Sequence, residues 1–213
     1  MKKPIKLGIS ILDEYVGSLK PGTTILIEGS PETYPYLLLH RIGYQVSRAG
    51  VKVTYIIWGD SVEDYREAAI NVGLDVLTLE RERLWKYFSA ASLNELWNIA
   101  LKEATKSLIL IDATSMPLEL SLKEAMELKN MAEKWGTIVV VSITPLVIEE
   151  KTLLLLEKLF DIVLELQVKI IRDEVRYLMN IKKHKKMPKK GLIITYSIGA
   201  QGIKVEQLRK IPY

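Results

Sequence analysis

The chain has 213 residues, of which 48% are apolar and 26% are charged, as is typical of a globular protein. It contains no cysteine and only two histidines, which excludes disulfides, thiol nucleophiles, cysteine-ligated metals and histidine-rich metal sites. The net charge of +4 is small, so the overall composition permits a nucleic-acid partner without requiring one.

Apolar runs in the sequence are short. None approaches the roughly 18 residues that span a bilayer, and no apolar stretch follows the lysines near the start. We therefore expect a cytoplasmic protein with no membrane partner. The absence of cysteine, together with abundant lysine, glutamate, isoleucine and leucine, is typical of a thermophile.

Short apolar segments alternate with segments of helical periodicity over the first three quarters of the chain. Residues 23–29 are β-rich, follow a Pro-Gly turn and stop at a glycine. Residues 121–135 predict the clearest amphipathic helix, because Ser121 and Glu124 have the spacing of a capping box. The other predicted strands are 51–58, 75–79, 107–112 and 137–143, and the other predicted helices are 35–48, 62–71, 93–106 and 151–160.

After residue 161 the pattern changes to a run of strands. Residues 162–170 and 174–182 predict an antiparallel pair joined at 172–173, and 192–197 and 203–205 predict two further strands. This order predicts an α/β fold with a mostly parallel central sheet flanked by helices and a C-terminal antiparallel extension at one edge. We find no repeat or linker, so we expect residues 1–213 to form a single domain.

The turn after the first predicted strand has the length and position of a phosphate-binding loop, G-x-x-x-x-G-K-[ST]. Tyr34 replaces the second glycine, and its side chain disfavours the left-handed backbone geometry of that position. Pro35 replaces the lysine and also removes a backbone donor, while Tyr36 replaces the residue that would hold Mg²⁺. Glu32 adds negative charge where an anion would sit. The whole turn comprises Gly29, Ser30, Pro31, Glu32, Thr33, Tyr34, Pro35 and Tyr36.

These changes predict that the turn does not bind ATP–Mg²⁺ tightly. Each lost charge-assisted contact costs on the order of 1.5–3 kcal/mol, and several are lost together. The simpler alternative is an ordinary strand–helix turn, for which Pro35 is well suited as the first helical residue.

The chain as a whole resembles the RecA superfamily, and most closely its archaeal KaiC-like and RadB-like branch. Residues 7–14 and 20–29 look like that family's entry segment, and residues 107–112 resemble its Walker B strand. Residues 161–203 resemble its closing meander. The resemblance covers nearly all of the chain and implies a RecA-like P-loop NTPase fold.

The resemblance also locates what this sequence lacks. Family members place a catalytic glutamate at the end of the second core strand, where this chain has Gly59 followed by Asp60. Asp112 matches the magnesium-side aspartate, and we expect it to persist as a helix N-cap or a strand-end hydrogen-bond acceptor. We interpret the chain as an inactive ATPase homologue with a vestigial phosphate loop, a vestigial Walker B aspartate, no catalytic residues, no metal and no cofactor.

Six lysines lie within nine residues near the C-terminus, at 182–190. They predict either a solvated β-turn or a contact with the nucleic-acid backbone, and the RadB-like branch carries a basic Lys-His motif implicated in DNA contact. Against DNA, the two loops that would face it, 114–120 and 144–150, are not basic. The candidate nucleic-acid contacts are Lys182, Lys183, His184, Lys185 and Lys186.

Three aromatic residues are expected beside the turn that replaces the phosphate loop. Tyr34 and Tyr36 begin the helix after this turn, and Trp58 ends the second predicted strand. They either fill the emptied phosphate site or form a protein-binding surface. RecA relatives assemble by adding a neighbour's peptide strand to an exposed sheet edge, which this chain could retain without ATP.

We therefore expect a non-catalytic adaptor or regulator that binds a protein or peptide. The partner could be an active RecA-family relative or a second copy of this chain. A RadB-like DNA-binding recombination accessory and a residual ATP-binding ATPase remain the alternative hypotheses.

Overall fold

A nine-stranded sheet runs through the part of the chain that the structure describes, with the strand order β3-β2-β4-β5-β1-β6-β7-β8-β9. The structure is a computed structural model, and it describes residues 5–105, 107–114, 121–171, 174–185, 192–200 and 202–210. The strands are β1 Thr24–Glu28, β2 Val53–Trp58, β3 Trp85–Ala90, β4 Leu108–Ala113, β5 Ile138–Ile143, β6 Ile162–Ile171, β7 Glu174–His184, β8 Leu192–Gly199 and β9 Gly202–Lys210.

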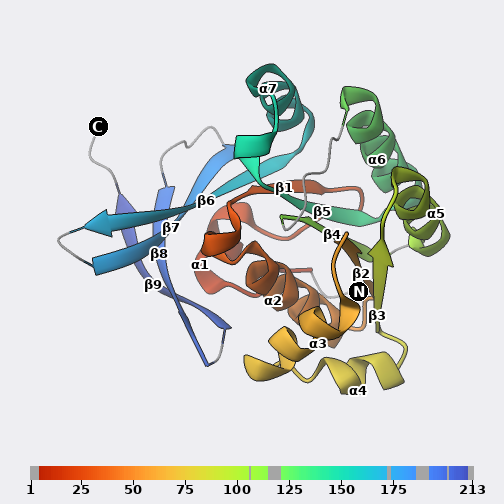
Figure 1. Cartoon of the computed structure of the whole chain (residues 1–213), viewed down its shortest axis with the longest axis horizontal. Coiled ribbons are helices and arrows are strands. Elements are labelled where there is room, and N and C mark those ends of the chain that lie inside the picture. Colours follow the sequence, from red (N-terminus) through yellow and green to blue (C-terminus); the bar gives the residue numbers. More distant parts are fainter. Residues whose placement is uncertain are drawn as a thin grey trace.

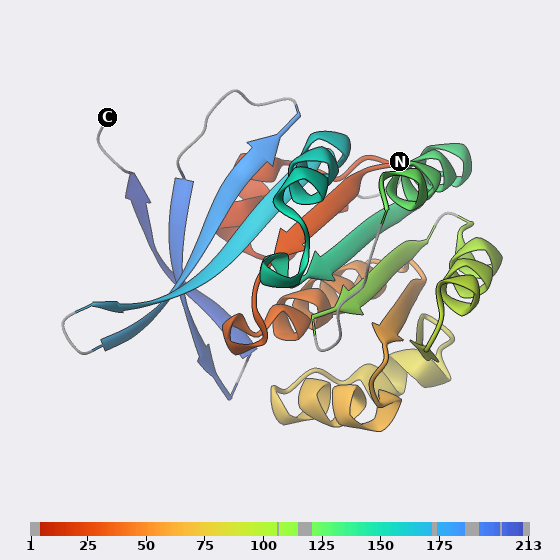
Figure 2. The same cartoon turned by 45° about the horizontal axis from the view of Figure 1, so that its top comes forward.

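The first six strands in this order, from β3 at the edge through β2, β4, β5 and β1 to β6, are parallel. Strands β7, β8 and β9 continue the sheet from β6 in antiparallel pairs (Figure 1). The predicted mixed sheet is therefore confirmed. Figure 2 shows the β6–β7 hairpin projecting beyond the helices. The parallel strands β1, β4 and β5 are mostly apolar and are buried throughout, as expected for central strands covered on both faces.

Helices cover both faces of the sheet and divide the core into two clusters. One cluster packs α1, α2, α3 and α4 on one face, and the other packs α5, α6 and α7 on the opposite face. Among the described residues, no helix has both the length and the apolar character that crossing a membrane demands. The helices are α1 Ser10–Val16, α2 Pro35–Arg48, α3 Val62–Asn71, α4 Val76–Arg81, α5 Leu93–Glu103, α6 Leu122–Trp135 and α7 Glu150–Leu159, with short 3₁₀ turns η1 Pro31–Thr33 and η2 Pro145–Val147.

Local signals in the sequence set several helix ends. Helix α2 begins at Pro35, as predicted, because proline is preorganised for the first helical position. Helix α6 begins with the predicted capping box, in which Ser121 and Glu124 each bond to the other's backbone N–H. Gly136 ends α6 in the left-handed conformation.

The predicted strand at 75–79 is wrong, since these residues belong to helix α4. Asp75 caps this helix by accepting a hydrogen bond from the Thr78 N–H at 3.1 Å, and Val76 and Leu79 bury one helical face. The third strand in the chain is instead β3, which was not predicted. Trp85 begins β3 and packs against α2 where the helix has Gly43: a Cβ there would lie 2.6 Å from the indole.

Candidate functional site

The turn between β1 and α2 closes on itself through its own backbone. The Thr33 N–H donates to the Ser30 carbonyl at 2.9 Å, and the Tyr34 N–H donates to the Pro31 carbonyl at 3.0 Å. The Ser30 hydroxyl and the N–H of Glu32 both donate to the Glu32 carboxylate, which lowers the pKa of that carboxyl. Pro31 has no N–H to offer. The N–H groups of Thr33 and Tyr34, which a phosphate-binding turn would direct at the anion, are therefore bonded within the turn.

The space beside Gly29 is filled. A Cβ on Gly29 would lie 2.6 Å from the Thr33 hydroxyl oxygen and 3.2 Å from the Pro35 ring. Thr33 is buried, and its hydroxyl donates to the Ser30 carbonyl at 2.7 Å. From β8, the buried Tyr196 hydroxyl donates to the Thr33 carbonyl at 2.9 Å. The antiparallel extension thus fixes the turn from outside.

Tyr34 adopts the left-handed conformation, with φ of 54° and ψ of 53°. The side chain disfavours this geometry, as expected, but Tyr34 adopts it nevertheless. Tyr34 makes edge contacts with Tyr36 and Tyr177, each with ring centroids 6.1 Å apart. These contacts account for how a residue with a bulky side chain is held in a conformation that favours glycine.

Asp112 lies at the end of β4 and is 1% exposed. Its Oδ1 accepts hydrogen bonds from the Thr114 N–H at 3.1 Å, the Thr114 hydroxyl at 2.7 Å and the Ser142 hydroxyl at 2.8 Å. Its Oδ2 accepts from the Tyr55 hydroxyl at 3.2 Å. Burial raises the pKa of Asp112, while these donors act to lower it. Asp112 is therefore a strand-end acceptor, one of its two expected roles.

The carboxylate of Asp60, which follows Gly59, is also engaged locally. Gly59 has a φ of 73° and follows β2 directly. Asp60 accepts the N–H of Ser61 at 2.8 Å, just before α3.

A cluster of buried rings that the sequence did not point to lies under α2. The His40 Nδ1–H donates to the Tyr36 carbonyl at 2.8 Å, so Nε2 accepts from the Tyr87 hydroxyl at 3.0 Å. Burial lowers the pKa of His40 to about 4, which keeps it neutral. Tyr55 and Tyr87 are in register on β2 and β3, and this shared inward position is the signal that could have revealed the cluster.

The structure separates the three aromatic residues proposed as a protein contact. Tyr34 and Tyr36 are half-buried on the α1–α4 side of the sheet. Trp58 is half-buried and packs against the α5–α7 cluster. Tyr34 and Tyr36 therefore fill space beside the turn, and Trp58 does not join them.

The lysine cluster is tied to the protein itself over the residues that are described. Lys182 bonds Glu28 at 2.8 Å and Glu157 at 2.5 Å. Lys183 donates to the carbonyls of Glu157, Lys158 and Phe160 at 2.8, 2.6 and 2.5 Å, where α7 ends. Lys185 pairs with Asp161 at 3.3 Å, His184 lies on β7 between these lysines, and Lys186 falls outside the described residues.

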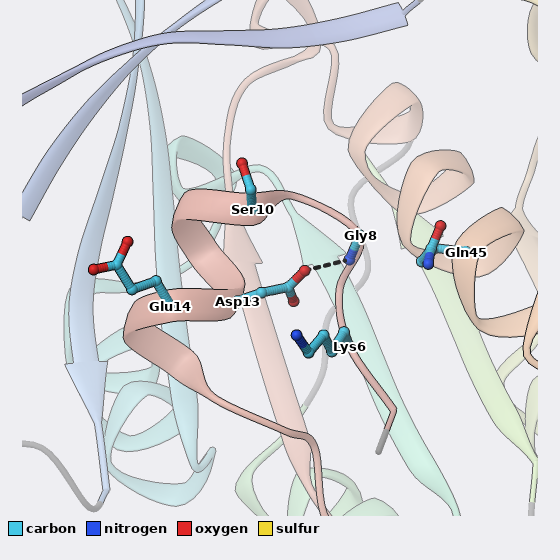
Figure 3. A pocket seen from close by; sticks show the side chains of 6 residues that line it. All are labelled: Lys6, Gly8, Ser10, Asp13, Glu14 and Gln45. Carbon is cyan, nitrogen blue, oxygen red and sulfur yellow. Dashed lines mark hydrogen bonds between the residues drawn. The ribbon is translucent and has the colours of Figure 1, made fainter. Parts of the chain in front are cut away.

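A polar pocket of about 420 Å³ opens between the N-terminal segment and α2. Figure 3 shows the Asp13 carboxylate turned toward Gly8, while Glu14 points away from it. Asp13 accepts the N–H groups of Leu7 at 2.6 Å and Gly8 at 3.1 Å, so its carboxylate holds the backbone. Within the described ranges, no group of three or more His, Asp or Glu side chains is arranged to hold a metal ion.

No protein-family model matches the sequence, and no curated protein matches it. Among solved structures, the fold is similar to that of the KaiC-like protein PH0186 from the hyperthermophilic archaeon Pyrococcus horikoshii OT3, with a TM-score of 0.79 and 18% identity, covering 97% of this chain and 100% of that chain. It is also similar to the flagellar accessory protein FlaH from Methanocaldococcus jannaschii, with a TM-score of 0.79 and 17% identity and the same coverage, 97% and 100%. The chain therefore has the RecA-like fold of these proteins, and likeness at such identities shows the fold alone.

Replacing Asp112 by Asn should destabilise the fold by about 2–4 kcal/mol, because the amide group would face hydrogen-bond donors. Urea denaturation measures this loss. The Ser142→Ala variant removes one donor and should cost only about 1 kcal/mol. A loss below about 0.5 kcal/mol in Asp112→Asn would contradict the structural role.

Replacing Lys182 by Met should also destabilise the fold by about 2–4 kcal/mol, because the buried Glu28 carboxylate would lose its ion-pair partner. The matched control is Lys185→Met, whose side chain is 61% exposed and whose pair with Asp161 should contribute less than about 1 kcal/mol. Equal denaturation midpoints for both variants would mean that Lys182 does not serve the fold.

Proposed function

We propose that this chain is a non-catalytic RecA-fold protein that acts as an adaptor or regulator by binding another protein. The observation that carries the proposal is the turn between β1 and α2. Its donors bond to Ser30, Pro31 and Glu32, and its interior is filled by Thr33 and Pro35.

The chemistry of phosphoryl transfer supports the non-catalytic part of the proposal. Transfer depends on positioned cations and donors around the phosphates and on a residue that orients the attacking water. Here Pro35 and Tyr36 stand where a lysine and a magnesium-binding hydroxyl would act, and Gly59 stands at the glutamate position. Asp112 already accepts four hydrogen bonds from the protein.

An exposed apolar surface supports the binding part. On the projecting β6–β7 hairpin, Val168, Ile170 and Val175 are exposed, Ile170 to 75%, and we call these three residues the hairpin surface. Ile170 and Val175 are directly opposite in the antiparallel register, so they share one face. Clustered exposed apolar side chains mark interaction sites more often than isolated ones do.

The two alternative functions receive less support from the geometry. Lys182 and Lys183 are bonded to the protein's own carboxylates and carbonyls, so they are not free to follow a nucleic-acid backbone. A residual ATPase would need the turn to open and exchange its internal bonds for phosphate contacts. FlaH, one of the similar structures, is described as an accessory protein, and an accessory role is compatible with binding without hydrolysis.

Isothermal titration of the chain with ATP–Mg²⁺ should show no binding up to about 1 mM, that is, a binding free energy weaker than roughly −4 kcal/mol. A variant with Tyr34→Gly, Pro35→Lys and Tyr36→Thr serves as the matched comparison, because it restores the loop residues. Binding of ATP by the unaltered chain in the micromolar range would contradict the proposal.

Replacing Ile170 and Val175 together by Ser should abolish capture of a protein partner from the lysate of the source organism. Because both side chains are exposed, the free energy of unfolding should change by no more than about 0.5 kcal/mol. The control is Leu101→Ser on α5, which removes an equally exposed apolar side chain from a distant surface. Retention of the same partners by the hairpin variant would show that this surface is not the contact.

A further inference from the structure

Glu28 is a buried carboxylate whose hydrogen bonding is incomplete. It is the last residue of β1, it directly precedes the turn at Gly29, and it is 1% exposed. Its Oε2 accepts from the Lys182 ammonium at 2.8 Å, while its buried Oε1 has no hydrogen-bond partner. A buried charged oxygen without a donor is costly, because it has lost water and gained nothing in return.

Charged groups reach Glu28 from three neighbouring elements. Glu165 is paired with it across β1 and β6, Glu157 comes from α7, and Lys182 comes from β7. On its other side, β5 places the uncharged Ile143 in register with Glu28. Lys182 is therefore a single ammonium shared among carboxylates, and it bonds Glu157 as well, at 2.5 Å.

This imbalance makes the ionised form of Glu28 unfavourable in the closed structure. Burial, the largest influence, raises the pKa of Glu28, Lys182 lowers it, and Glu157 and Glu165 raise it, so that the pKa lies at about 7. Burial acts to lower the pKa of Lys182, but Glu157 and Glu28 raise it well above its ordinary value, so the ammonium stays charged throughout. A second buried acceptor, Asn180 Oδ1, also has no partner, and Asn180 is bonded to Glu165. The surroundings of Glu28 are thus rich in acceptors.

We propose that Glu28, Lys182 and Glu157 form a proton-sensitive latch that ties α7, and β7 across the intervening strand β6, to the end of β1, and that it loosens when Glu28 loses its proton. We call these three residues the Glu28 latch. The latch lies where β1 passes into the turn at Gly29, and β7 continues from it into the projecting hairpin. This inference goes beyond the proposed function, because it concerns how that end of the sheet opens and not what binds there.

The sign and size of the effect follow from proton linkage. Local opening exposes Glu28 to water and returns its pKa to about 4.5, so opening releases a proton. Opening should therefore be favoured up to about tenfold for each pH unit between roughly 4.5 and 7. Above about 7, Glu28 is ionised in both states and the dependence should level off.

The test is a carbon-13 NMR titration of the Glu28 carboxyl, combined with hydrogen exchange of the β1 and α7 amides from pH 5 to 8.5. We expect the Glu28 midpoint near pH 7 and, after correction for intrinsic exchange, opening constants that rise with pH and then level off. The Glu28→Gln variant should show no such rise, because the amide does not titrate. The control Glu67→Gln, at an exposed site on α3, should behave as the unaltered chain does.

A Glu28 midpoint at or below pH 4.5 would overturn the latch, because it would mean that the ion pair outweighs burial. The same pH dependence of exchange in Glu28→Gln would also overturn it. Should that variant fail to fold, Glu165→Gln provides a second test, because it removes a repelling charge without touching Lys182. Its Glu28 midpoint should move to lower pH, and an unchanged midpoint would contradict the proposal. None of these outcomes depends on nucleotide or partner binding.

Discussion

The turn that follows β1 bonds two of its backbone N–H groups to its own carbonyls, and the interpretation of the site depends on this. A phosphate-binding turn needs unpaired N–H groups that converge on an anion. In this chain the N–H groups of Thr33 and Tyr34 bond within the turn, and the Glu32 carboxylate takes two further donors. The turn therefore supplies its own anion and its own acceptors. Tyr196 then ties the turn to the antiparallel extension, so opening it would also disturb β8.

Two buried carboxylates at strand ends illustrate opposite solutions to one physical problem. Burial raises the pKa of Asp112 as well, but Asp112 accepts four hydrogen bonds that oppose this rise, one of them from Tyr55 on the neighbouring strand. Glu28 has the Lys182 ammonium on one oxygen and no donor on the other. Hydrogen bonds to the charged form favour ionisation, and burial without them disfavours it. The first carboxylate is thus a fixed structural anchor, whereas the second is poised to exchange a proton.

Local sequence signals predicted most of the fold because they act over a few residues. Helix α2 begins at Pro35, and the capping box at Ser121 begins α6, both where the sequence placed them. Edge strand β3 was missed because the exposed polar residues Lys86 and Ser89 interrupt it, so it shows neither an apolar run nor a regular alternation. The neighbouring segment at 75–79 is apolar enough for a strand, but Asp75 caps its N-terminus and so favours a helix.

The site itself was less predictable, because its contacts join residues far apart in the chain. Lys182 and Glu28 are separated by 154 positions, and nothing in a run of lysines shows that one of them neutralises a buried glutamate. A charge cluster that looks like a binding surface in sequence can therefore be an internal requirement of the fold. The sequence shows which residue types stand in the turn after β1, yet only the three-dimensional arrangement shows which contacts they make. In this chain the contacts are hydrogen bonds, rings and one ion pair, all gathered at the end of the sheet where strands β1 and β4 finish.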